Sequence, residues 1–198
     1  STEIGQNNAL YQKFKALSTS AEYTGLTQAQ RATIDNEIRD FELSGVALDE
    51  QHKASFKKIN TELVKLCQQY EQNVLDATQS WSLQLNNKAD LAGLPDAVIQ
   101  AAAQNAEEAG LEGWRFTLHA PSYIPFMTYA DSRKLRKQMY EAYATRASER
   151  GPDAGKWDNS EIMQDIVRLR REKAGLLGFK SYTDYSLQTK MADKIGRA

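Results

Sequence analysis

Two histidines are the residues of this chain best suited to metal or acid–base chemistry. His52 is followed by Lys-Ala-Ser and His119 by Ala-Pro-Ser. A His-Glu-x-x-His zinc site instead needs two imidazoles on one helix face with a Glu beside them, and catalytic zinc needs a third protein ligand. The chain has a single cysteine, Cys67. The sequence therefore predicts no metal ligand, and both histidines are interpreted as ordinary surface or packing residues.

The run Gly151-Pro-Asp-Ala-Gly155-Lys156 has the residue types of a phosphate-binding loop. Its two glycines are separated by three residues, whereas such a loop requires four between them. Trp157 also stands where the magnesium-binding hydroxyl is required. The run is therefore predicted to be a loop between two helices.

Charged side chains offer two further candidates. Glu42 could act as a general base, but Arg39 lies one helical turn earlier, so an Arg39–Glu42 ion pair on a helix surface is the preferred interpretation. Two basic clusters are predicted to be solvated helix faces rather than anion sites, because acids balance them and cations suit a helix C-terminus. Their members are Arg133, Lys134, Arg136 and Lys137, and Arg168, Arg170, Arg171 and Lys173.

Aromatic side chains could line a peptide-binding groove, because they combine a large contact area with a polar tip. The candidates are Tyr23, Trp81, Trp114 and Trp157. In a helical domain most such residues anchor a core. Trp157 keeps the groove role as an open alternative, since it adjoins the glycine-bearing loop. No catalytic residue is predicted, and substrate-binding residues stay undetermined.

Composition narrows the class of protein. Of 198 residues, 41% are hydrophobic and 26% charged, which is typical of a soluble globular protein with a real core. A net charge of −1 argues against nucleic acid as a partner. No apolar run approaches the ~20 residues of a membrane helix, and no signal peptide is recognisable. We expect a cytoplasmic protein that binds neither membrane nor nucleic acid.

Hydrophobic periodicity predicts a mainly α chain. Helices are expected over Asn7–Ser18, from Thr27 to about Ser44, and from about Asp49 to Ala77. Thr27 and Gln30 have capping-box spacing, and Gly45 is expected to end the second helix. The longest helix carries an apolar stripe that would bury against neighbouring helices. That stripe comprises Phe56, Ile59, Leu63, Leu66, Tyr70 and Val74.

After the long helix, the helical periodicity of the sequence gives way to an alternation of apolar and polar residues. Trp81–Leu85 and Trp114–Leu118 alternate apolar and polar residues, so they can pair as a small two-stranded antiparallel sheet around a helix over Pro95–Ala109. Pro121 and Pro125 are expected to break the chain before a helix over about Asp131–Ser148.

The last helices are predicted from their caps. Asp158 is expected to cap the next helix, with Glu161 returning the bond. Gly178 and Phe179 resemble a glycine C-cap, and Ser181 begins a last short helix.

Several runs of residues resemble one known family. The resemblance is strongest in Tyr140–Glu161, Arg39–Gly45 and Leu176–Tyr182, and it extends over nearly the whole chain. Further matching runs are Gly5–Tyr11, Asn73–Thr78, Ala120–Pro125 and Thr189–Ala192. These runs are similar to the zinc-dependent oligopeptidases of the thimet oligopeptidase family, in its bacterial oligopeptidase A branch.

The resemblance implies a helical segment of a two-lobed peptidase whose narrow channel admits short, unstructured peptides. It implies zinc in the full-length parent and none in this chain, because no metal ligand or catalytic acid of the family maps onto a residue here. Residues 1–113 would form a helical subregion with the long helix and first strand. Residues 114–198 would form a second subregion, and both would belong to one larger peptidase.

Two hypotheses for function stay open. In the first, the chain is an inactive portion of a zinc endo-oligopeptidase that degrades short peptides. In the second, it is a standalone helical interaction module on a peptidase-derived scaffold. Either way, an apolar face of the long helix bearing Phe56, Ile59, Leu63 and Leu66 is expected to drive self-association.

Overall fold

The computed structural model describes residues 2–192 and 196, and 66% of the chain is helical. The chain forms two compact units, Ser1–Lys65 with Asp165–Ala198, and Leu66–Gln164. We call them unit 1 and unit 2, and each is described separately. The expected division between residues 113 and 114 falls inside unit 2, between two paired strands. Within the described part of the chain, no helix is both long and apolar enough to cross a membrane.

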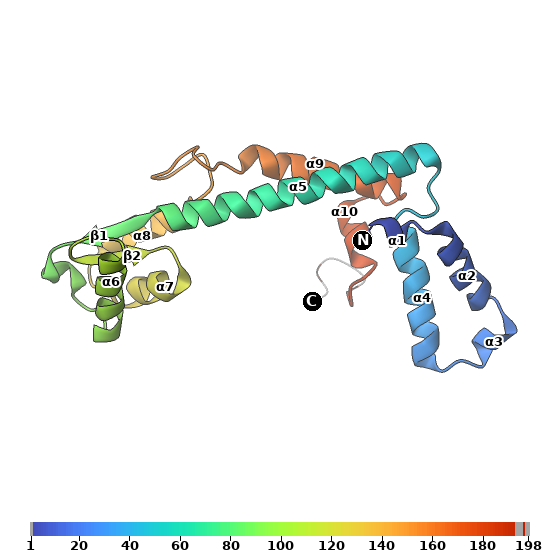
Figure 1. The fold of residues 1–198 in the computed structure, drawn as a ribbon, viewed down its shortest axis with the longest axis horizontal. Coiled ribbons are helices and arrows are strands. Elements are labelled where there is room, and N and C mark those ends of the chain that lie inside the picture. The colour runs from blue at the N-terminus through green and yellow to red at the C-terminus, as the bar shows by residue number, and fades with distance from the viewer. Residues whose placement is uncertain (1, 193–195, 197–198) are drawn as a thin grey trace. The chain divides into compact units, whose positions relative to one another are not determined.

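The regular elements among the described residues of unit 1 are all helices (Figure 1). It contains α1 (Thr2–Gly5), α2 (Asn8–Ser18), α3 (Ala21–Thr24), α4 (Gln28–Leu43), the first part of α5 (Glu50–Ser80), the last part of α9 (Ser160–Leu176) and α10 (Tyr182–Leu187). The helices predicted from Asn7, Thr27, Asp49 and Ser181 are thereby confirmed, while α1 and α3 are single turns that periodicity cannot reveal.

Helix α4 begins with the predicted capping box. The Gln30 backbone N–H donates to Thr27 Oγ1 at 3.3 Å, and the Thr27 N–H donates to Gln30 Oε1 at 3.0 Å. Two donors that the first turn would otherwise leave unpaired are satisfied, an arrangement worth about 1 kcal/mol. Helix α4 ends just before Gly45, also as predicted.

An aromatic cluster holds α2 against α4. Tyr11 and Phe41 are buried with their ring centroids 6.0 Å apart, and Phe14 packs on Phe41 at 5.9 Å. The Tyr11 hydroxyl donates to Glu42 Oε1 at 2.7 Å, so this buried ring keeps its polar group satisfied.

The apolar stripe of α5 is buried at its start. Phe56 is 1% exposed and Ile59 is 9% exposed. Burial of these two residues agrees with the predicted stripe. The same burial means that Phe56 and Ile59 are not part of an exposed face that could drive self-association. Tyr70, a member of the stripe that was predicted to be buried, is exposed, and Val64 and Leu75 are exposed apolar residues of α5 outside the stripe.

Unit 2 surrounds a two-stranded antiparallel sheet. Strand β1 (Ser82–Leu85) pairs with β2 (Trp114–Thr117), with Leu83 opposite Phe116. Figure 1 shows α6, α7 and α8 gathered around this sheet. The remaining elements are η1 (Lys88–Leu91), α6 (Asp96–Glu108), α7 (Ala120–Tyr129), α8 (Arg133–Ala144), and the adjoining parts of α5 and α9. The predicted sheet and the helix it encloses are confirmed.

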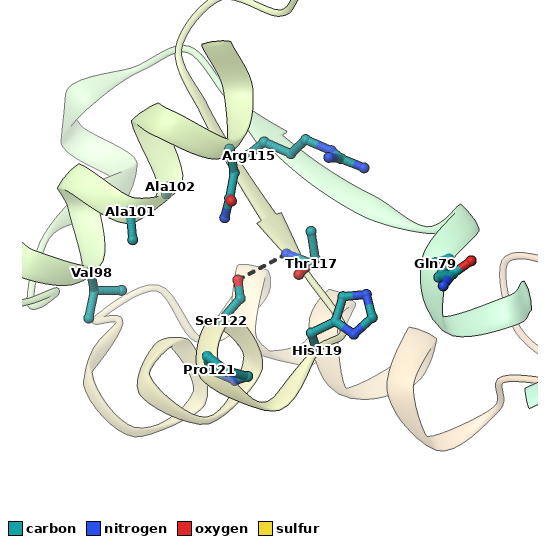
Figure 2. Close-up of a pocket in the computed structure, with 10 residues that line it drawn as sticks. Gln79, Val98, Ala101, Ala102, Arg115, Thr117, His119, Pro121 and Ser122 are labelled. Carbon is teal, nitrogen blue, oxygen red and sulfur yellow. Dashed lines mark hydrogen bonds between the residues drawn. The ribbon is translucent and has the colours of Figure 1, made fainter. Parts of the chain in front are cut away.

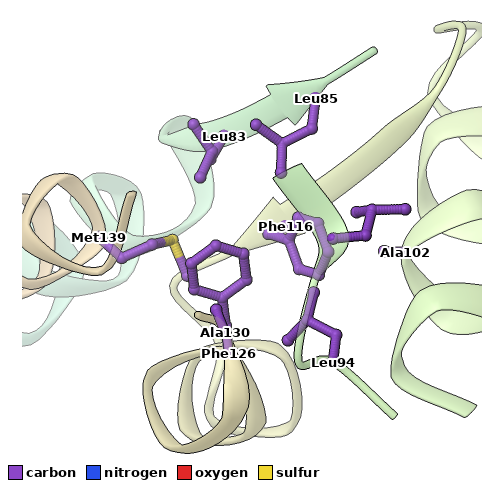
Figure 3. Close-up of a cluster of buried hydrophobic side chains, with 9 residues drawn as sticks. Leu83, Leu85, Leu94, Ala102, Phe116, Phe126, Ala130 and Met139 are labelled. Carbon is purple, nitrogen blue, oxygen red and sulfur yellow. The ribbon is translucent and has the colours of Figure 1, made fainter. Parts of the chain in front are cut away.

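One face of the sheet forms the core of unit 2 (Figure 3). Phe116 and Phe126 are fully buried and meet edge to face with centroids 4.7 Å apart. Such pairs contribute about 0.5–1.5 kcal/mol beyond the burial of their area. The other buried members are Leu83, Leu85, Leu91, Leu94, Ala102, Ala130 and Met139. The alternation along β1 and β2 therefore sets which side chains enter the core.

The predicted chain break at Pro121 and Pro125 is wrong. Both prolines lie within α7. Pro121 sits in the first turn, where its missing N–H has no helical partner to lose, so it is well tolerated. Pro125 removes one helical hydrogen bond, and the burial of Phe126 beside it offsets that loss.

The two ends of the 145–159 segment differ from prediction in detail. Helix α8 ends at Ala144 rather than near Ser148. Before α9, Asp158 Oδ1 accepts the Ser160 backbone N–H at 2.8 Å, whereas Glu161 returns no hydrogen bond among the described residues. The Ser160 hydroxyl also donates to Asp158 Oδ1, at 2.7 Å, so Asp158 accepts two hydrogen bonds from Ser160 and the reciprocal half of the predicted cap is not formed in the part of the chain that the structure describes. The predicted loop at Gly151–Lys156 is confirmed.

Candidate functional site

A concave site of unit 2 with several polar lining residues lies beside β2, between α6 and the start of α7. We call it the β2–α6 cleft, and its volume is about 440 Å³. Figure 2 shows Arg115, Thr117 and His119 succeeding one another along β2 and the residues after it. The full lining comprises Gln79, Val98, Ala101, Ala102, Asn105, Arg115, Thr117, His119, Pro121 and Ser122. This size is ordinary for a small-molecule site.

Strand geometry places the polar residues of the cleft. Side chains alternate along β2, so Arg115 and Thr117 share the side opposite Phe116, which enters the core. The turn that follows presents His119 just before α7 begins. On α6, Ala101 and Asn105 lie one turn apart and face the same cleft.

One hydrogen bond fixes the wall of the cleft at α7. The Thr117 backbone N–H donates to Ser122 Oγ at 3.0 Å, the dashed line in Figure 2. This N–H therefore points away from β1, and the edge of β2 opposite β1 faces the cleft. Because N–H groups two residues apart point to the same edge, the Arg115 N–H lies on that edge as well.

A second concave site lies in unit 1, and its volume is about 450 Å³. It is lined by His52, Ser55, Ile59, Glu172, Gly175 and Leu176. His52 Nδ1 lies 2.7 Å from Asp49 Oδ2, and hydrogen bonds from the His52 backbone and ring lower the pKa of the Asp49 carboxyl. Glu172 is engaged by Arg168 at 3.0 Å. The charged groups of this site thus already have partners.

Sequence comparisons connect the chain to one family of peptidases. Profiles of peptidase family M3 and of the neurolysin/thimet oligopeptidase N-terminal domain match residues 126–196 and 1–53, respectively. Oligopeptidase A of Haemophilus influenzae is 53% identical over 193 residues, which is 98% of this chain and 28% of that relative. Oligopeptidase A of Escherichia coli is 48% identical over the same shares. The chain is an oligopeptidase A-like segment of peptidase family M3.

More distant relatives carry another peptidase name. Dipeptidyl carboxypeptidase of Salmonella typhimurium is 33% identical over 97% of the chain and 28% of its own length. The chain therefore spans little more than a quarter of the curated relatives it matches. The resemblance predicted from Tyr140–Glu161 and Arg39–Gly45 is confirmed, since these runs lie within the two matched regions.

The residues of this family M3 segment do not fit a metal site. Over residues 2–192 and 196, no group of three His, Cys, Asp or Glu side chains lies close enough to hold an ion. His52 is paired with Asp49, and His119 lines a cleft without a carboxylate. Cys67, the single cysteine, is half-buried.

Glu42 has a different partner from the one predicted. Arg39 contacts Asp40 at 2.8 Å and Asn36 at 2.8 Å, so the expected Arg39–Glu42 pair is absent from the described contacts. Glu42 instead accepts the Tyr11 hydroxyl. The reason is tertiary: α2 brings Tyr11 to Glu42, and Arg39 finds nearer acceptors on its own helix.

Some members of the two basic clusters form ion pairs or bind a helix end. Arg168 contacts Asp165 at 2.9 Å and Glu172 at 3.0 Å. Arg136 donates to the Ala130 carbonyl after α7. Lys173 departs from the predicted solvated face, because its Nζ lies 5.2 Å from the Phe56 ring and burial lowers its pKa.

Most of the candidate groove aromatics have structural roles. Trp81 and Trp114 pack against the core of unit 2. The Tyr23 hydroxyl donates to Asp35 at 2.7 Å, a bond that raises the pKa of the Tyr23 hydroxyl. Trp157 is half-buried, with Lys156 Nζ 4.2 Å from its ring centroid. A groove role for Trp157 stays a prediction.

Sequence reasoning missed the β2–α6 cleft. The sequence predicts Arg115 only as part of a strand and His119 only as a surface or packing residue. The signal that could have found them is the sequence Arg115-Phe-Thr117-Leu-His119, in which polar residues alternate with residues that enter the core. Alternation places these three side chains on one side, but it does not reveal that α6 and α7 enclose them.

Proposed function

We propose that this chain is a non-catalytic portion of a zinc-dependent metallo-endopeptidase that hydrolyses short peptides. The 53% identity to Haemophilus influenzae oligopeptidase A carries the proposal, because it extends over 193 residues. Support also comes from the two family profiles, which match both ends of the chain. In this proposal the helices of both units are structural parts of one larger peptidase.

The zinc would be held outside this chain. A catalytic zinc needs three protein ligands and an open position, supplied mostly by His, Cys, Asp and Glu. His52 already has Asp49 as its partner, and the cleft that contains His119 offers no carboxylate. When bound elsewhere in the full-length protein, zinc would supply a polarised water for peptide hydrolysis. The 198 residues themselves would be inactive.

A chimera tests whether the segment is part of such an enzyme. The chain would replace its matched segment in Haemophilus influenzae oligopeptidase A, and hydrolysis of a fluorogenic peptide would be measured. We expect activity within about tenfold of the parent, a difference of about 1.4 kcal/mol in the barrier. The parent and a variant lacking the segment are the controls. A folded, monodisperse chimera without activity would contradict the proposal.

The isolated chain provides the complementary test. After dialysis, we expect neither stoichiometric zinc by elemental analysis nor turnover of the same peptide. One tightly held zinc per chain, or turnover that a chelator abolishes, would contradict the proposal that the zinc site lies outside these 198 residues.

A standalone interaction module is the second candidate. It is favoured by apolar side chains that unit 1 leaves exposed, with Val64 at 59% and Val167 at 66%. Exposed apolar side chains that gather in a patch can mark a surface that binds another protein or the rest of a peptidase. A reading frame that continues into a His-Glu-x-x-His motif would support the peptidase, and one that stops after residue 198 would support the module.

The cytoplasm is the proposed location. A plant relative that is 38% identical over 96% of the chain is named as a probable cytosolic oligopeptidase A of Arabidopsis thaliana. Fractionation of cells that express the native gene would test the location, with the soluble fraction as the expected result.

A further inference from the structure

The β2–α6 cleft gathers polar side chains that have no protein partner. Gln79, Asn105, Arg115 and His119 all line it, and their side chains make no hydrogen bond or ion pair with any residue that the structure describes. Solvated side chains on a convex surface commonly lack partners as well. These four differ because they converge on one concave site of about 440 Å³.

The charge of the cleft is positive. Arg115 carries a permanent charge, and no Asp or Glu is among the lining residues. The first turn of α7, which contributes Pro121 and Ser122, adds the positive end of a helix dipole. The cleft thus favours a negatively charged ligand on electrostatic grounds.

Hydrogen-bond donors reinforce this preference. Ser122 Oγ accepts the Thr117 N–H at 3.0 Å, so the Ser122 hydroxyl proton stays available to a ligand. The Arg115 backbone N–H lies on the same strand edge as the Thr117 N–H and adds a further donor there. With the Arg115 guanidinium and the Asn105 amide, the cleft presents several donors to an anionic acceptor.

The opposite wall is apolar. Val98, Ala101, Ala102 and Pro121 supply it. An apolar wall beside the Arg115 guanidinium suits an organic anion with a short hydrocarbon body rather than a fully hydrated inorganic ion. The planar guanidinium also matches a planar carboxylate through two parallel hydrogen bonds.

We propose that the β2–α6 cleft binds the carboxylate group of a small organic anion, with Arg115 as the charged partner and Ser122 and Asn105 as supporting donors. The inference rests on the geometry of unit 2 alone. It stands whether or not the chain belongs to an active peptidase.

Two probes of equal shape test the proposal in the 198-residue chain. N-acetylalanine carries a free carboxylate, and N-acetylalanine amide replaces it with a neutral group. Titrations would be followed by amide chemical shifts in ¹⁵N NMR spectra. We expect saturable shifts at Thr117, Ser122 and Asn105 with the acid, at a Kd of about 1 mM. With the amide we expect binding at least about tenfold weaker.

A pair of matched variants tests whether Arg115 is the charged partner of the ligand. R115Q should raise the Kd for N-acetylalanine about tenfold or more, because it removes the charged donors. R133Q makes the same change in net charge at an exposed position of α8 outside the cleft, and it should leave the Kd unchanged. The dispersion of the NMR spectra confirms that both variants are folded.

Three results would overturn the proposal. The first is equal binding of the acid and the amide, which would assign recognition to the apolar body. The second is an equal loss of affinity in R115Q and R133Q, which would indicate nonspecific charge attraction. The third is inorganic phosphate binding as tightly as the acid and shifting the same amides, which would make the cleft a general anion site.

Discussion

Asn73 on α5 donates a hydrogen bond from Nδ2 to Oδ1 of Asn159 at 2.8 Å, and both side chains are buried. Asn159 Nδ2 donates in turn to the Tyr70 carbonyl at 3.1 Å, and Gln69 Nε2 donates to Asn73 Oδ1 at 2.8 Å. The Asn159 backbone N–H donates to the Ala147 carbonyl. This amide network therefore joins the start of α9 to α5 within unit 2.

Replacing either asparagine should destabilise unit 2. N159A leaves the buried Nδ2 of Asn73 unpaired, which costs about 1–3 kcal/mol. Because all three tryptophans, Trp81, Trp114 and Trp157, lie in unit 2, their fluorescence during urea unfolding reports on this unit. Q68A, an exposed change on the same helix, should stay within about 0.5 kcal/mol of the unchanged chain.

The double variant N73A/N159A should cost less than the sum of the single variants. Removing both partners leaves no lone unpaired amide, so a coupling energy of about 0.5–3 kcal/mol is expected. Strict additivity would show that the two side chains do not depend on each other.

Substitutions at two glycines of the segment 145–159 allow the cost of backbone strain to be measured separately from the cost of steric overlap. Gly151 has φ of +88° and Gly155 has φ of +76°. A Cβ at Gly151 would overlap Thr145 Oγ1, whereas a Cβ at Gly155 would meet nothing within 4 Å. G155A should therefore cost only the left-handed backbone penalty of about 1–2 kcal/mol.

G151A should cost clearly more than G155A, because it adds the overlap with Thr145 to the same backbone penalty. Tryptophan fluorescence during urea unfolding again gives the measurement. Equal losses in the two variants would mean that the loop shifts to relieve the overlap.

The carboxyl of Asp158 should titrate below its ordinary range. The Ser160 hydroxyl and then the Ser160 backbone N–H donate to it and lower its pKa. A lowered pKa in the folded state means that ionised Asp158 stabilises the fold above its unfolded pKa. This contribution is lost as the pH falls through the folded pKa.

S160A should raise the pKa of Asp158 only part of the way, since the backbone donor stays in place. A ¹³C NMR titration of the carboxyl measures the change. S181A removes a comparable cap from α10 and should leave Asp158 unaffected. An unchanged Asp158 titration in S160A would refute the role of the hydroxyl.

The isolated chain should self-associate through exposed apolar side chains. Val64 and Val167 are the most exposed valines of unit 1, and each could contribute about 1.5–3 kcal/mol on burial. Light scattering over a dilution series should show association that V64D/V167D abolishes and that L111D, in unit 2, does not. A monomer at every concentration that binds no hydrophobic dye would contradict this expectation.

The sequence by itself determined the local elements of this chain. Periodicity located α4, α5 and α6, and the Thr27–Gln30 spacing predicted a capping box that the structure contains. Alternation in Trp81–Leu85 and Trp114–Leu118 predicted the paired strands. These features could be predicted because neighbouring residues in the sequence decide them, through backbone hydrogen bonds and the repeat of each element. Family membership followed in the same way, from runs of consecutive residues.

Only the tertiary structure decided which distant residues meet. Asn73 and Asn159 lie 86 positions apart, and Glu42 binds Tyr11 of another helix rather than nearby Arg39. The β2–α6 cleft draws Asn105, Arg115 and Ser122 from three elements. Helix α7 also accommodates Pro125, which local rules place outside a helix interior, since Phe126 is buried beside it. The physical reason is common to all four: packing pairs groups by their positions in space, and the spacing of residues along the chain does not specify those positions.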